Sequence, residues 1–163
     1  MEILVVDDEL AIRKGLAALL EESGYSVRTA RDGIAALGAV RAGRPDLVLL
    51  DVMMPLMDGF AVCERIRQHD RDIPIVFLTA KDADGDQVRG LEVGADDFVS
   101  KGVDNAVLLA RIRKSIERGS RLAGLRGSRL TTTLSPASLS LVSDPAPLRG
   151  GTRRSEGDGR KGK

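Results

Sequence analysis

The chain is poor in three features that would point to particular classes of protein. It has one cysteine, Cys63, which excludes an internal disulfide and a zinc cluster built from cysteines. It has three Phe, one Tyr and no Trp, so we expect an aliphatic core and no surface built on aromatic stacking. No run approaches the roughly 20 apolar residues of a membrane span, and the N-terminus lacks the basic flank and long apolar region of a signal peptide. We therefore expect a cytoplasmic protein without membrane association.

Charge divides the chain into two unlike segments, although the net charge is only +1. Residues 1–110 hold 12 Lys/Arg and 20 Asp/Glu, whereas residues 111–163 hold 13 Lys/Arg and 4 Asp/Glu. The long N-terminal segment is therefore acidic and the C-terminal one basic.

Apolar runs and helical patterns alternate along the acidic segment. The runs are Ile3–Val6, Leu47–Leu50, Ile75–Leu78 and Phe98–Val99, with an alternating stretch at Tyr25–Thr29. Continuous apolar runs are typical of strands buried on both faces of a parallel sheet. Segments with apolar residues at helical spacing follow each run. The pattern predicts a (βα)5 α/β domain with a five-stranded, doubly wound parallel sheet.

The pattern ends near Gly119. Of the 45 residues from 119 to 163, 18 are Gly, Ser or Pro, and no helical stripe is visible. The stretch Leu130–Val142 fits one or two short strands, and Gly150–Lys163 is basic, Gly-rich and expected to be disordered. We therefore expect a domain at 1–118 and a low-complexity tail at 119–163, which is either disordered or the remnant of a truncated output domain.

Polar side chains follow four of the predicted strands. These are Asp7 and Asp8, then Asp51, Thr79 and Lys101. Because sites in open parallel sheets form outside the carboxyl ends of the strands, these groups should meet at one edge. Carboxylates suit Mg²⁺, an aspartate can attack phosphorus, and an ammonium and a hydroxyl can contact phosphoryl oxygens.

Each of these residues also has a simpler interpretation. Asp7 or Asp8 would serve equally well as a helix cap, Thr79 as a turn residue and Lys101 as a solvated side chain. Four strand ends that all supply phosphate-handling groups are harder to assign to chance. The constellation therefore predicts a phosphate site more strongly than any of its members does.

Four segments together resemble the receiver domains of response regulators in two-component signalling. They are VVDDE at 5–9, LLDVMMPLMDGF at 49–60, FLTAK at 77–81 and GADDFVSK at 94–101, and the resemblance covers about residues 1–118. It implies the flavodoxin-like receiver fold with strand order 2-1-3-4-5. It also implies a signalling switch that accepts a phosphoryl group from a histidine kinase and catalyses its own phosphorylation and dephosphorylation, without being a conventional enzyme.

The resemblance also implies roles for individual residues. Asp51 would be the phosphoacceptor, and Lys101 would contact the phosphoryl group. Asp7, Asp8, Asp51 and the backbone carbonyl of Met53 would hold Mg²⁺. Thr79 and Phe98 would move together on phosphorylation and change the surface formed by the fourth helix, the fifth strand and the fifth helix. The family usually has a cis proline after the lysine, where this chain has Gly102; a cis bond there would cost roughly 2.5–4 kcal/mol, so we expect a trans bond or a more mobile loop.

A finer resemblance, at 89–98 and 108–118, is to the OmpR/PhoB-like subgroup with winged-helix outputs. Receivers of that subgroup dimerise through intersubunit ion pairs, which Asp97 with Arg111 and Asp96 with Arg118 would match here. A solvated helix face explains these residues equally well.

Two other functions stay open. One is a DNA-binding transcriptional regulator whose output domain is truncated here; a winged helix needs roughly 100 residues, so we do not expect specific DNA binding by this chain. The other is a Mg²⁺-dependent phosphohydrolase of the haloacid-dehalogenase type, whose Asp-x-Asp nucleophile motif at the first strand is missing here. We assign no chemistry to His69, expected at the surface, or to Cys63, expected in the core.

Overall fold

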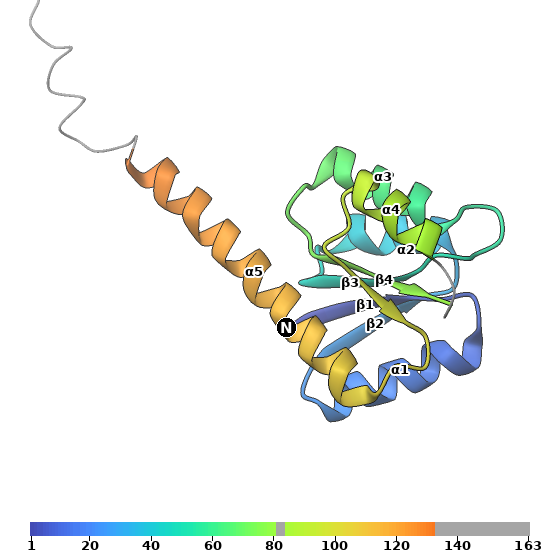
Figure 1. Cartoon of the computed structure of the whole chain (residues 1–163). Helices are drawn as coiled ribbons and strands as arrows, with labels where there is room; N and C mark the ends of the chain where they lie inside the picture. The colour runs from blue at the N-terminus through green and yellow to red at the C-terminus, as the bar shows by residue number, and fades with distance from the viewer. Residues whose placement is uncertain (81–83, 133–163) are drawn as a thin grey trace, which may run out of the picture. The chain divides into compact units, whose positions relative to one another are not determined.

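The structure, a computed structural model, describes residues 1–80 and 84–132 (Figure 1). Five strands and five helices alternate along these residues. The strands are β1 (Glu2–Val6), β2 (Ser26–Ala30), β3 (Leu47–Asp51), β4 (Ile75–Thr79) and β5 (Asp97–Ser100). The helices are α1 (Leu10–Glu22), α2 (Gly33–Ala42), α3 (Gly59–His69), α4 (Asp84–Val93) and α5 (Asn105–Thr132). All pairings are parallel and the order is β2-β1-β3-β4-β5, which confirms the predicted (βα)5 fold and strand order.

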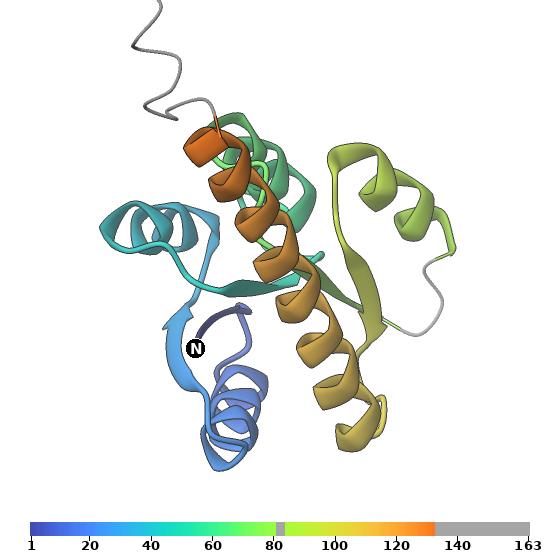
Figure 2. The ribbon, with the colours of Figure 1, turned by 90° about the vertical axis from the view of Figure 1, so that its left-hand side faces the viewer.

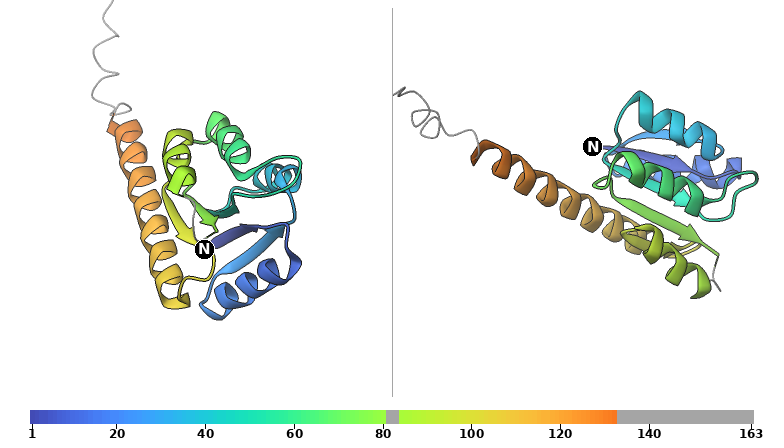
Figure 3. Two further views of the ribbon diagram at one scale, coloured as in Figure 1. Left: turned by 45° about the vertical axis from the view of Figure 1, so that its right-hand side comes forward. Right: turned by 90° about the horizontal axis from the view of Figure 1, so that it is seen from above.

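The helices cover both faces of the sheet, which explains why the inner strands β1, β3 and β4 are apolar along almost their whole length. In β1, Leu4 and Val6 belong to a core cluster with side chains of α2 and α3, whereas Ile3 and Val5 belong to a second cluster with side chains of α1 and α5. Figure 3 shows α2, α3 and α4 on one side of the sheet, and Figure 2 shows α5 crossing in front of the other side. Alternate residues of each inner strand therefore point into two separate apolar layers.

The fifth helix differs from the sequence expectation. Its helical pattern was expected to end near Gly119, yet α5 continues to Thr132. Gly119 lies against the ring of Pro74, where a β-carbon would come within 2.6 Å of the ring, and Arg126 pairs with Asp72 at 2.6 Å. Packing of the helix against the loop before β4 thus overrides the low helix propensity of glycine. The expected strand at 130–142 is wrong for residues 130–132, and its remainder lies outside the described residues.

Candidate functional site

The sheet register brings the predicted site residues together. Val6 pairs with Leu50, so Asp7 and Asp51, the next residues of β1 and β3, lie side by side. Thr79 pairs with Ser100 at the ends of β4 and β5, and Lys101 follows directly. One oxygen each of Asp7, Asp8 and Asp51 lie within 4.8 Å of one another. The carboxyl ends of the strands therefore form the edge predicted from the sequence.

Two of the three carboxylates are buried. Asp7 is fully buried and Asp51 is 2% exposed, whereas Asp8 is exposed. Neither Asp7 nor Asp8 caps α1, because its N-cap residue is Glu9 and that position has no side-chain cap. Instead, Oδ1 of Asp7 accepts a hydrogen bond from the backbone N–H of Glu9 at 2.9 Å. The simpler interpretation of these aspartates as helix caps is wrong.

Lys101 lies between the buried carboxylates. Its Nζ is 3.1 Å from Oδ2 of Asp7 and 3.1 Å from Oδ2 of Asp51. Apart from these ion pairs, neither Oδ2 accepts a hydrogen bond from any described residue. Oδ1 of Asp51 does accept one, from the backbone N–H of Met53 at 3.2 Å. One ammonium thus faces two buried negative charges.

This arrangement shifts the ionisation of the site. Burial, followed by the negative charge of Asp7, raises the pKa of Asp51 to about 6, although Lys101 and the Met53 N–H act in the opposite direction. Burial of Lys101 opposes its own charge, but its contacts with Asp7 and Asp51 raise the pKa of the ammonium above the usual value. The carboxylate cluster lacks enough positive charge of its own, which is the situation a divalent cation relieves.

The donor set fits Mg²⁺. It consists of hard carboxylate oxygens from three residues, and two of these residues, Asp7 and Asp51, each have a buried Oδ2 whose one described partner is Lys101. Magnesium prefers such oxygen ligands and usually keeps several waters, so it needs only a few groups from the protein. Asp8, exposed at the same edge, leaves one side of the cluster open to solvent.

Loops and glycines hold this edge in place. At Gly59, the first residue of α3, a β-carbon would collide with the backbone carbonyl oxygen of Asp51, so only glycine lets α3 begin this close to β3. The side chain of Asp58 caps the same helix by accepting from Ala61 N at 2.8 Å. The backbone N–H of Lys101 donates to the carbonyl of Thr79 at 2.6 Å, which joins the ends of β4 and β5.

The loop after Lys101 shows why glycine stands there. The described residues contain no cis peptide bond, so Lys101–Gly102 is trans, as expected, and Gly102 has a φ of 89°. Proline is fixed near −65° and could not adopt that conformation. The loop therefore requires glycine in the form it has here.

Of the two predicted switch residues, Thr79 lies in the interior of the domain and Phe98 is half-buried. Thr79 is buried, and the ring of Phe98 stacks on Phe77 with 5.3 Å between ring centroids. Gly90 of α4 makes room for Phe98, since a β-carbon at Gly90 would collide with the ring. The role of Gly90 was not predictable from the sequence, because a glycine inside a helix gives no sign of which side chain packs against it.

Three of the four predicted dimer residues have partners within their own chain. Arg111 pairs with Asp97 at 2.9 Å, and Asp96 pairs with Arg67 at 3.0 Å while accepting from Ile75 N at 2.8 Å. Arg118 is exposed. Cys63 is buried, which raises the pKa of its thiol to about 11, and His69 is exposed at the end of α3; both placements match the expectation.

Comparison with known proteins identifies relatives along most of the chain. Residues 3–113 match the family model of the response regulator receiver domain. Response regulator MprA of Mycobacterium avium is 47% identical over 118 residues, which cover 72% of this chain and 52% of the relative. The chain thus spans about half the length of the curated relatives it matches. Among the helices of the described residues, none is both long and apolar enough to cross a bilayer.

Solved structures give the same result. Vibrio cholerae chemotaxis protein CheY4 is 32% identical with a TM-score of 0.67, and the match covers 70% of this chain and 97% of that one. NtrX from Brucella abortus is 30% identical with a TM-score of 0.75, covering 78% of this chain and 30% of that one. Family model, relatives, fold and carboxylate edge all agree, and this chain belongs to the response regulator receiver domain family of two-component signalling.

Proposed function

We propose that this chain is a phosphorylation-dependent switch in which Asp51 accepts a phosphoryl group from the phosphohistidine of a sensor histidine kinase, with Mg²⁺ as cofactor. The observation that carries the proposal is the pair of buried Oδ2 atoms of Asp7 and Asp51, which share one lysine and have no other partner among the described residues. A fold that keeps two such charges side by side gains a site for cations and phosphoryl groups at the expense of stability.

The transfer is a displacement at phosphorus. A carboxylate oxygen of Asp51 forms a bond to the phosphorus while the bond from phosphorus to the imidazole nitrogen of the kinase breaks. The imidazole leaves with the bonding electron pair and takes up a proton, and Asp51 becomes an aspartyl phosphate. Mg²⁺, held by Asp7, Asp8, Asp51 and the Met53 carbonyl, would neutralise charge on the phosphoryl oxygens.

The chain's own groups supply the remaining contacts. Lys101, already between Asp7 and Asp51, is placed to hold one phosphoryl oxygen through its ammonium. The hydroxyl of Thr79, at the end of β4, would donate to another. Its movement toward the phosphoryl group would empty space that the ring of Phe98 can fill, which would change the surface of α4, β5 and α5.

The test is intact-mass analysis after incubation with acetyl phosphate and Mg²⁺. We expect one phosphoryl adduct on the wild-type chain and none on Asp51→Asn or in the presence of EDTA. Glu64→Gln, which alters an exposed carboxylate of α3, is the matched control and should be phosphorylated normally. An adduct that survives in Asp51→Asn, or no adduct on a chain shown to be folded by circular dichroism, would contradict the proposal.

We also propose that phosphorylation promotes a homodimer through the α4–β5–α5 face. Val88 and Leu91 on α4 are 62% and 67% exposed, and Val107 on α5 is 41% exposed, so both helices beside β5 present apolar side chains to solvent. The Asp97–Arg111 pair within one chain would have to open and re-form between subunits. Sedimentation velocity should show dimer only with acetyl phosphate and Mg²⁺, and Arg111→Ala should weaken it; an unchanged monomer would contradict this proposal.

Transcription regulation by the complete protein is a further proposal that follows from the named relatives. Membership of the receiver family favours the switch over the phosphohydrolase alternative. The domain boundary at 118 likewise stays a proposal, although α5 runs past it to Thr132, and so does the nature of the basic segment, whose residues 133–163 lie outside the described part of the chain.

A further inference from the structure

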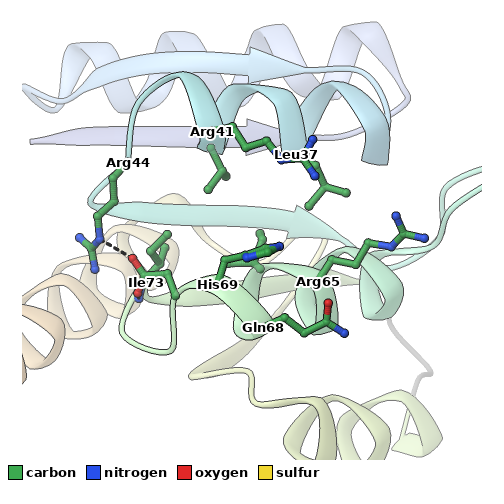
Figure 4. A pocket seen from close by; sticks show the side chains of 10 residues that line it. Leu37, Arg41, Arg44, Arg65, Gln68, His69 and Ile73 are labelled. Carbon is green, nitrogen blue, oxygen red and sulfur yellow. Dashed lines mark hydrogen bonds and ion pairs between the residues drawn. The ribbon is translucent and has the colours of Figure 1, made fainter.

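A hollow of about 370 Å³ lies between α2 and α3, apart from the phosphorylation site (Figure 4). Pockets of a few hundred Å³ are large enough for small organic ligands. None of the carboxylates at the strand ends lines it, nor does Lys101 or Thr79. The receiver chemistry therefore does not account for this hollow.

The floor of the hollow is apolar. Leu37 and Val40 come from α2, Ile66 from α3 and Ile73 from the loop before β4. Ile66 and Ile73 belong to the core cluster on this side of the sheet, with Leu37 and Val40 packed against it. A ligand in the hollow would therefore touch the hydrophobic core directly, and its apolar part would be removed from water.

The rim is basic. Arg41 belongs to the last turn of α2, Arg44 to the loop that follows it and Arg65 to α3, and Figure 4 shows His69 on the α3 side of the hollow. Asp70 is the one carboxylate among the lining residues, and Arg44 already binds it at 2.6 Å. Arg41 and Arg65 make no ion pair with any described residue. Residues 1–110 carry eight more acidic than basic groups, from 20 Asp/Glu and 12 Lys/Arg, so this rim is opposite in sign to the net charge of the domain.

We propose that this hollow binds a small amphiphilic anion, namely a carboxylate or phosphate head group joined to an apolar body of about ten carbons. The guanidinium groups of Arg41 and Arg65 would hold the head group through charge-assisted hydrogen bonds. The body would lie on Leu37, Val40 and the two buried isoleucines.

Charge argues against two other occupants. The chain's own residues 133–163 contain six Lys/Arg and three Asp/Glu, so the basic rim would repel them. A nucleic acid would offer phosphates to the arginines but would leave the apolar floor uncovered and would face repulsion from the acidic domain around it. A single negative charge on an apolar body matches both parts of the hollow.

The experiment is a titration of the full chain with decanoate, kept below its micelle-forming concentration, and followed by amide chemical shifts in NMR spectra. We expect saturable shifts confined to α2, the end of α3 and the loop before β4. Acetate, which has the charge without the body, and 1-decanol, which has the body without the charge, should each bind at least about tenfold more weakly. Equal responses to decanoate and acetate would overturn the proposal, because they would indicate an anion on surface arginines only.

Two variants test the parts of the hollow separately. Arg41→Gln combined with Arg65→Gln should weaken decanoate about tenfold or more, whereas Arg113→Gln, an exposed arginine of α5, should leave the affinity unchanged. Val40→Phe, which fills the floor, should abolish binding while the melting curve shows that the fold is retained. Undiminished binding by either pocket variant would overturn the proposal. So would binding of phosphatidylglycerol vesicles without binding of free decanoate, since that result would indicate a membrane-facing surface.

Discussion

At the scale of single residues, folding moves Asp7 and Asp51 out of water and places them beside each other at the ends of β1 and β3. Lys101 lies 3.1 Å from both, but one positive charge cannot neutralise two. The identity of these residues was predictable from the sequence, because each follows an apolar run. Their burial and the unsatisfied oxygens were not, since the sequence does not show how close neighbouring strand ends come.

Asp51→Asn should stabilise the fold at neutral pH without Mg²⁺. Because the pKa of Asp51 is raised to about 6, the folded chain binds more protons than the unfolded chain between about pH 4 and pH 6. The stabilisation that Asp51 contributes is complete below the pKa that its carboxyl has in the unfolded chain, and it is lost as the pH rises through 6. We expect a gain on the order of 1–3 kcal/mol in the free energy of unfolding at pH 7 with EDTA.

Urea unfolding from pH 4 to pH 8 checks this prediction. The difference between the variant and the wild type should grow across pH 4–6 and then level off. Glu64→Gln serves as the control and should follow the wild type. A variant less stable than the wild type at pH 7 would mean that Asp51 stabilises the metal-free fold.

Gly102→Ala should destabilise the domain, because Gly102 has a φ of 89° that residues with a β-carbon rarely adopt. Nothing lies within 4 Å of the added methyl group, so backbone strain alone would cost about 1–2 kcal/mol. The matched control is Gly15→Ala in α1, which is also free of neighbours and should stabilise the helix by about 0.5–1 kcal/mol. Thermal melts that shift in the same direction for both variants would argue against a strained loop.

At the scale of elements, α4 and β5 meet through one small residue and one large one. The ring of Phe98 occupies the space that a side chain at Gly90 would need, and it stacks on Phe77 of β4. The sequence predicted a helix here and a moving Phe98. The sequence did not indicate that Gly90 makes room for the ring of Phe98, because the two residues lie on different elements whose packing is not visible in the sequence.

Gly90→Ala should therefore displace Phe98 and lower stability by about 1–3 kcal/mol, the usual range for overpacking. Gly85→Ala on the same helix has open space around it and should be neutral or slightly stabilising. Thermal melts give the stability, and NMR shifts of the Phe98 ring report its displacement. Equal melting temperatures for the two variants would show that the ring has room to move aside without strain.

At the scale of the whole molecule, the sequence pattern was sufficient for the fold because the three inner strands are apolar on both faces and helical apolar spacing follows each strand. The prediction from the sequence pattern failed at the end of α5, where glycines suggested that a low-complexity tail begins. There the helix is supported by Gly119 against Pro74 and by the Arg126–Asp72 pair, which are contacts between residues 45 and 54 positions apart. Local composition carries no information on such partners. The hollow between α2 and α3 was missed for the same reason.

Truncation after residue 127 should leave the stability of the domain close to that of the full chain, because the Gly119 and Arg126 contacts remain. Truncation after residue 118 removes both contacts and should lower the melting temperature by several degrees, corresponding to about 1–2 kcal/mol. Differential scanning calorimetry on both truncated chains decides the matter. Identical melting temperatures would place the boundary of the folded domain at 118, as the sequence pattern suggested.

The two buried carboxylates also have an evolutionary consequence. Random substitution followed by selection for heat resistance alone should favour loss of Asp7 or Asp51, because removing either charge relieves repulsion in the metal-free fold. A library of variants sorted only for thermostability would therefore become enriched in chains that lack one of these two carboxylates. Under the function proposed above, selection for phosphotransfer would oppose this loss, so keeping both aspartates would come at a cost in metal-free stability.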